Sequence, residues 1–218
     1  MRVTGDLKKR YEEIRALDRS NIDECQAIAD FFDLYPQKIF RGELYKRESP
    51  DFEVSRVKNT IGIEVVKATS PQSKQLTSEL GKKGGPGYSM NWLKDINHTG
   101  KRLGKYIKEK QGDTAIWDSR EFHDFWVNIV GTAITKKSEL FTKHHFEKAY
   151  FESWLLVVDD SGLEFLNTSE LLTLLNEKSG KINCSFNKVF VLSGYRERLH
   201  LLGSRCGKFC HIASRSKY

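Results

Sequence analysis

Long apolar runs are missing from this 218-residue chain. No stretch approaches the roughly 18 apolar residues that a membrane-spanning helix needs. The opening residues, MRVTGDLKKRYEEI, lack the apolar centre of a signal peptide. We therefore expect no membrane association and a cytoplasmic location. Hydrophobic residues make up 39% and charged residues 30% of the chain, which suits a soluble domain with its own core.

Cysteine is also scarce. The four cysteines, Cys25, Cys184, Cys206 and Cys210, are too few and too scattered to form a disulfide framework in a chain of this size, so reduced thiols are expected. The segment CGKFCH could supply metal ligands, but its spacing of three residues and the lack of a second pair nearby argue against a zinc site.

A Walker A sequence is absent as well. The glycine-rich segment GKKGGPGYSM, at 81–90, has no Gly-Lys-Ser/Thr ending, which argues against nucleotide binding. Four glycines and a proline predict a loop there. Its lysines fit better as a clamp on a nucleic-acid backbone.

The net charge of +7 is unevenly distributed along the chain. Residues 74–110 hold nine Lys or Arg against three Asp or Glu, and residues 188–218 hold seven against one. Such segregation favours a partner that carries phosphates; the alternative is a solvated, lysine-rich face. The residues expected to bind nucleic acid are Lys82, Lys83, Lys94, Lys101, Arg102 and Lys105.

Hydrophobic periodicity predicts one α/β (α+β) domain over 1–218, with a central mixed sheet flanked by helices. Its core is expected over about 20–195, followed by a basic hairpin over 195–218. The expected helices are two within 7–34, one up to about 80, a central one from 118 or 119 to about 146, and one over 168–176. The expected strands are 38–46, 51–57, 60–67, 152–158 and 188–192.

Two carboxylates stand where a buried strand usually carries hydrocarbon. Alternation in the strand over 60–67 places Glu64 among apolar neighbours, where a carboxylate needs a hydrogen-bonding partner, a cation or a metal. A tight turn at 58–59 brings Asp51 beside it, and two such oxygen donors suit Mg²⁺ or Mn²⁺. The alternative is that Glu64 pairs with a basic side chain across the sheet and that Asp51 merely follows a proline at a turn.

These residues resemble a known family. Pro50-Asp51, followed after twelve residues by Glu64 in the pair Ile63-Glu64, with Lys67 close behind, is similar to the motif of the PD-(D/E)xK nuclease superfamily, which has the restriction-endonuclease-like fold. The resemblance covers roughly 20–195 and includes the central helix and the two buried strands after it. It implies that Asp51 and Glu64 bind the divalent metal and that a lysine positions or activates the attacking water.

The lysine departs from the family pattern. The family places it two residues after the glutamate, but Val66 occupies that position here, and a regular strand would point Lys67 to the opposite face. A β-bulge could redirect Lys67; otherwise Lys137, or its neighbour Lys136 on the central helix, takes the role. Glu24, with Glu48 behind it, is the candidate for a further acidic residue of the site, unless Glu24 only favours the amino end of its helix.

The resemblance therefore implies a metal-dependent nuclease that hydrolyses phosphodiester bonds of DNA or RNA, more readily DNA. The departure at Lys67 keeps a second interpretation open, in which the chain retains the fold without cleavage and binds nucleic acid or a protein partner. A homodimer is compatible with the first interpretation, since nucleases of this type that cut both strands often work as dimers.

Overall fold

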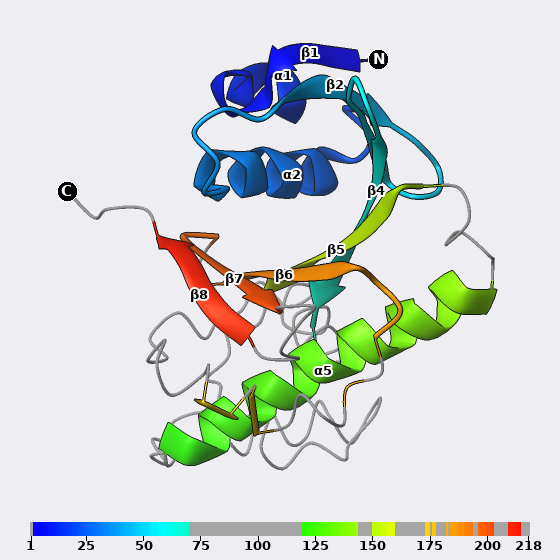
Figure 1. The fold of residues 1–218 in the computed structure, drawn as a ribbon. Helices are drawn as coiled ribbons and strands as arrows, with labels where there is room; N and C mark the ends of the chain where they lie inside the picture. The colour runs from blue at the N-terminus through cyan, green and yellow to red at the C-terminus, as the bar shows by residue number, and fades with distance from the viewer. Residues whose placement is uncertain are drawn as a thin grey trace, which may run out of the picture.

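The computed structural model describes residues 2–69, 119–143, 150–159, 173–174, 176–177, 182, 184–193, 196–202 and 209–214. Within these ranges the chain forms one mixed sheet of eight strands, whose spatial order follows their order in the sequence (Figure 1). The strands are β1 (Arg2–Asp6), β2 (Arg41–Lys46), β3 (Phe52–Ser55), β4 (Thr60–Ala68), β5 (Glu152–Asp159), β6 (Lys188–Ser193), β7 (Arg198–Leu202) and β8 (Phe209–Ser214). The helices are the 3₁₀ helix η1 (Leu7–Lys9), α1 (Tyr11–Arg15), α2 (Ile22–Leu34) and α5 (Ser119–Lys143).

Three central strands, β4, β5 and β6, run parallel, and every other neighbouring pair is antiparallel. A parallel neighbour requires a crossover connection, and α5 lies in the connection between β4 and β5. The predicted mixed sheet flanked by helices is therefore confirmed at the level of an α+β class.

Helices cover both faces of the sheet (Figure 1). One apolar cluster joins α1 and α2 to one face, with Phe31 and Trp154 among its buried side chains. A second joins α5 to the other face, with Trp126 and Leu155 among its members. Successive residues of β5 alternate between the two clusters, so β5 is buried on both faces, as its continuous apolar run predicts.

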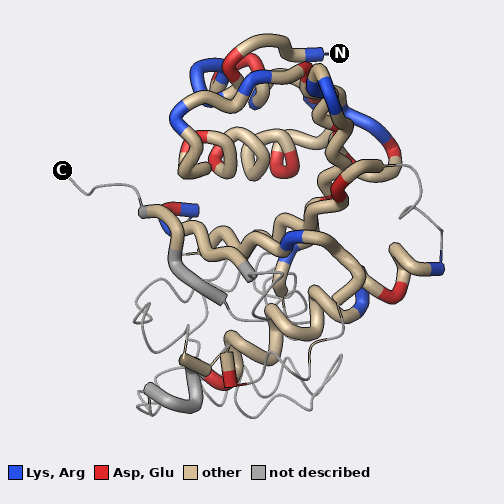
Figure 2. The backbone as a smooth tube through the Cα atoms, in the orientation of Figure 1, with Lys and Arg blue, Asp and Glu red and all other residues tan. Residues whose placement is uncertain are grey.

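Charged residues are unevenly distributed among the strands and helices. The parallel strands β5 and β6 carry charged residues only at their ends, whereas α1 and β2 also carry them within their length (Figure 2). Among the described residues no helix is long and apolar enough to cross a membrane.

Strand β1 was not expected from the sequence. Its five residues contain one apolar side chain that is buried, Val3, so they lack an alternating pattern. It forms because it pairs with β2 along its whole length, from Arg2 opposite Tyr45 to Asp6 opposite Arg41.

Candidate functional site

The β3–β4 hairpin sets the two predicted acids side by side. Phe52, the first residue of β3, pairs with Ile63, and Asp51 directly precedes it, so Asp51 comes level with Glu64. Phe52 and Ile63 belong to the apolar cluster under α2. By alternation, Glu64 lies toward the α5 face of the sheet, whereas Asp51, which precedes β3, lies at the edge of β4 between Glu64 and Lys46.

The Asp51 side chain takes the place of a neighbouring strand beside β4, just before β3 begins. The backbone N–H of Val65 donates a hydrogen bond of 2.7 Å to Asp51 Oδ2. Burial raises the pKa of Asp51 to about 6; the Val65 hydrogen bond and the charge of Lys137 oppose this rise, while the neighbouring Glu64 carboxylate adds to it. Burial is thus the main reason that the pKa of Asp51 is raised, and the nearby Glu64 carboxylate contributes to it.

Glu64 is 6% exposed and meets a lysine from the central helix. Lys137 Nζ lies 2.8 Å from Glu64 Oε2, and Ser49 Oγ lies 3.5 Å from Glu64 Oε1. Burial acts to lower the pKa of Lys137, but its hydrogen bond to Glu64 and the charges of Glu64, Asp51 and Glu24 raise it overall, so its amine stays charged. The structure therefore brings Lys137 to the predicted acids.

Lys67 lies elsewhere. The pairing of β4 with β5 runs without a shift from Ile61 to Ala68, so no bulge turns the side chain of Lys67 toward Glu64. Its amine instead forms a 2.7 Å ion pair with Asp23 Oδ2 on α2, on the other side of the sheet. Lys136 is exposed and lies away from the two acids, beside a separate depression along α5.

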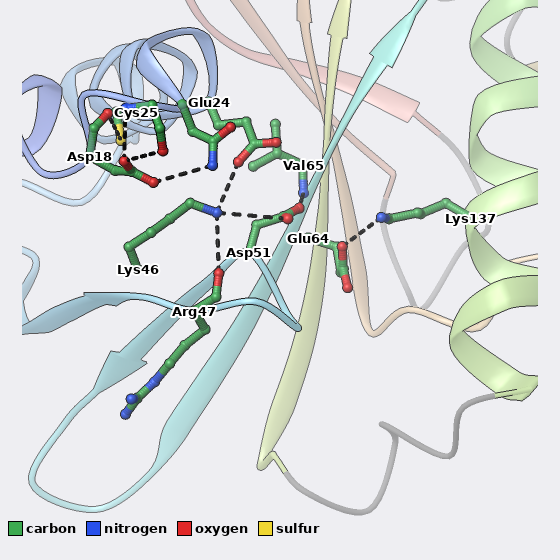
Figure 3. A network of polar contacts seen from close by, with 11 residues as sticks. Asp18, Glu24, Cys25, Lys46, Arg47, Asp51, Glu64, Val65 and Lys137 are labelled. Carbon is green, nitrogen blue, oxygen red and sulfur yellow. Dashed lines mark hydrogen bonds and ion pairs between the residues drawn. The ribbon is translucent and has the colours of Figure 1, made fainter.

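A further lysine, not anticipated from the sequence, stands in the site. Lys46, the last residue of β2, places its amine 2.9 Å from Glu24 Oε2, 3.9 Å from Asp51 Oδ1 and 3.2 Å from the Arg47 carbonyl oxygen (Figure 3). Glu24, on α2, thereby joins the site through Lys46. The sequence predicts β2 as a strand, but the packing of α2 against the sheet is needed to place Glu24 beside the Lys46 amine.

The part of the site around Lys46 borders an open depression of about 570 Å³. Its lining contains Glu24, Lys46 and Asp51, and also Glu48, the second acidic candidate. Polar groups line the floor, so the depression suits a charged ligand better than an apolar one.

In the part of the chain that the structure describes, two carboxylates are placed to hold a divalent ion. Among the described residues, no group of three or more His, Cys, Asp or Glu side chains lies close enough together to hold a metal. Mg²⁺ often binds one or two carboxylates and completes its shell with water and substrate phosphates, so Asp51 and Glu64 fit such an ion. A cation between the two acids would also offset the burial and the Glu64 charge that together raise the pKa of Asp51.

The basic residues expected to bind nucleic acid, Lys82, Lys83, Lys94, Lys101, Arg102 and Lys105, lie outside the described residues. The same holds for the loop over 81–90, for Cys206, and for the side chains of Cys210 and His211.

Comparisons with family models, with curated proteins and with solved structures found no match for this chain. Its function must therefore be argued from the geometry of the site.

Proposed function

We propose that the chain is a divalent-metal-dependent nuclease that hydrolyses phosphodiester bonds, with DNA as the first substrate to test and RNA as the alternative. The observation that carries the proposal is the buried pair Asp51 and Glu64 on adjoining strands, with the Lys137 amine 2.8 Å from Glu64. The succession of a hairpin, a long helix and two parallel strands supports a restriction-endonuclease-like fold.

In this proposal Asp51 and Glu64 hold Mg²⁺ or Mn²⁺. When bound, the ion supplies a Lewis acid for the phosphate oxygen and lowers the pKa of a coordinated water. Lys137 stays charged beside Glu64 and orients the attacking water, which replaces the Lys67 role that the motif implies. The basic residues of 74–110 bind the phosphate backbone.

The test is cleavage by the full chain with Mg²⁺ or Mn²⁺, on supercoiled plasmid, single-stranded DNA and RNA. Glu64→Gln is expected to lower the cleavage rate by at least 100-fold, on the order of what removing a catalytic electrostatic group costs. Lys137→Met is expected to lower it while Mn²⁺ binding persists. Lys67→Met is the matched control, because Lys67 pairs with Asp23 on the opposite face, and its cleavage rate is expected to stay within about twofold of wild type.

Retained cleavage in Glu64→Gln would refute the assignment. Circular dichroism of each variant separates loss of activity from loss of fold. Gln is chosen because it keeps the shape of Glu64 while removing its charge.

A second candidate function is nucleic-acid binding without hydrolysis. It is favoured by the two lysine amines that already neutralise the acids, Lys137 at Glu64 and Lys46 between Glu24 and Asp51. In that case nucleic acid binds with a strong salt dependence, and no product forms with either metal.

A further inference from the structure

The Lys46 amine occupies the place between Glu24 and Asp51 that a cation would take. It reaches the Glu24 carboxylate on α2, the Asp51 carboxylate before β3 and the Arg47 carbonyl oxygen, three oxygen atoms from three parts of the chain (Figure 3). Its contact with Glu24 is an ion pair without hydrogen-bond geometry, so Glu24 Oε2 is a buried oxygen that accepts no hydrogen bond. Lys46 therefore acts there mainly as a point charge.

Strand pairing holds Lys46 in this position. Lys46 is opposite Phe52 in the β2–β3 register, and its amine lies 4.9 Å from the centre of the Phe52 ring. The side chain is only 13% exposed. An ammonium group over an aromatic face and beside two carboxylates is stabilised where it stands, so Lys46 is a built-in part of the site rather than a mobile surface lysine.

The oxygens on the other side of the site are held less closely. Glu64 Oε1 has Ser49 Oγ at 3.5 Å, and Asp51 Oδ1 has Lys46 Nζ at 3.9 Å. Both contacts are long, so Glu64 Oε1 and Asp51 Oδ1 can still bind a divalent ion on the Glu64 side of the site. Asp51 Oδ1 is then shared with Lys46, which already fills the place between Glu24 and Asp51.

The depression also carries excess negative charge. Its lining holds four acids, Asp18, Glu24, Glu48 and Asp51, against two bases, Lys46 and Arg47. Removal of the Lys46 charge would leave four carboxylates facing one arginine, and Glu24 and Asp51 would share no cation.

We propose that Lys46 serves as an internal cation that fills the second of two adjacent cation positions and so limits the site to one divalent ion. This inference rests on the proposed function, because it assumes that Asp51 and Glu64 bind the first ion. It makes Lys46 a positioning residue that sets the metal stoichiometry of the site.

The experiment counts bound Mn²⁺ per chain by electron paramagnetic resonance and isothermal titration calorimetry, with the full chain and without nucleic acid. Wild type is expected to bind one ion, Lys46→Met two, and Lys46→Met combined with Glu24→Gln one again. Lys46→Arg keeps the charge and is expected to bind one. Circular dichroism checks each fold, and Lys46→Gln, with its polar end beside Glu24, takes the place of Lys46→Met if the latter does not fold.

Two ions in wild type, or one ion in folded Lys46→Met and Lys46→Gln, would overturn this inference and leave the proposed function intact. Absence of Mn²⁺ binding in wild type and in both Lys46 variants would overturn the proposed function as well.

Discussion

The Asp51 carboxylate has two roles, and only one of them requires that it be ionised. Its first role is to accept the hydrogen bond from the backbone N–H of Val65, as the backbone of a neighbouring strand would. An uncharged side chain can accept this bond equally well. As a neighbour of Glu64 it would hold a divalent ion, a role that requires charge. Burial and the Glu64 carboxylate make the charged form costly, and the charge of Lys137 offsets only part of that cost, so a divalent ion would favour the charged form further.

The pH dependence of stability should show this cost. The folded pKa of Asp51 is about 6, above the usual value of about 3.9 in an unfolded chain. The folded state thus keeps a proton that the unfolded state releases, so the stability contributed by Asp51 is complete below pH 4 and is lost as pH rises through 6. In chelator, the free energy of unfolding of Asp51→Asn minus that of wild type is expected to rise by about 2 kcal/mol from pH 4 to 7.

Asp23→Asn is the control for that measurement, by urea unfolding across the same pH range. The pKa of Asp23 is lowered, chiefly by the hydrogen bond from Lys67, so its substitution shifts the difference in the opposite direction. A pH-independent difference for Asp51→Asn would show that Asp51 is ionised in the folded protein without a metal.

At the scale of the elements, the hairpin positions the acids because β4 has no side chain at Gly62. A Cβ there would lie 3.0 Å from Pro50 Cγ and 3.0 Å from the Tyr150 ring, which is closer than neighbouring atoms normally pack. The segment carrying Pro50 and Asp51 can therefore lie against β4, two residues from Glu64 on the same face.

Gly62→Ala should displace that segment. We expect it to lower the free energy of unfolding by about 1–3 kcal/mol, as overpacking does, and to weaken Mn²⁺ binding at Asp51. Gly131→Ala on α5 is the matched control, since its Cβ would meet Ile182 at an ordinary 3.7 Å and Ala favours a helix by about 1 kcal/mol. Thermal unfolding and Mn²⁺ titration of both variants check this; equal stability changes in the two would contradict it.

Local sequence patterns were sufficient to predict the two strands that position the acids. Alternation and the turn at 58–59 predicted β3 and β4 within two residues, and the same alternation pointed Lys67 away from Glu64. The Lys46 position was beyond such patterns, because it depends on the packing of α2 against the sheet. The β1 strand was missed for a similar reason, since it depends on its pairing with β2.

For the whole molecule, the acidic site sits in a chain of net charge +7, so attraction to a polyanion must come from elsewhere on its surface. Two segments hold the excess of positive charge: residues 74–110, with nine Lys or Arg against three Asp or Glu, and residues 188–218, with seven against one. A nuclease needs both kinds of charge, because basic residues attract the phosphates that the carboxylates of the site repel. A divalent ion bound to the carboxylates removes this repulsion.

Affinity for nucleic acid should therefore fall steeply with salt, with a slope of log K against log salt of about 0.9 per duplex phosphate neutralised. Alanine at four basic residues is expected to reduce that slope by roughly 3.6 if each contacts a duplex phosphate: Lys82, Lys83, Lys101 and Arg102. A control with the same change in net charge replaces four exposed residues of the N-terminal part: Arg2, Lys9, Arg19 and Lys38. Fluorescence anisotropy with Glu64→Gln as the background keeps the substrate intact. An equal loss of slope in both sets would show that net charge, rather than a basic surface contributed by 74–110, draws the polyanion to the site.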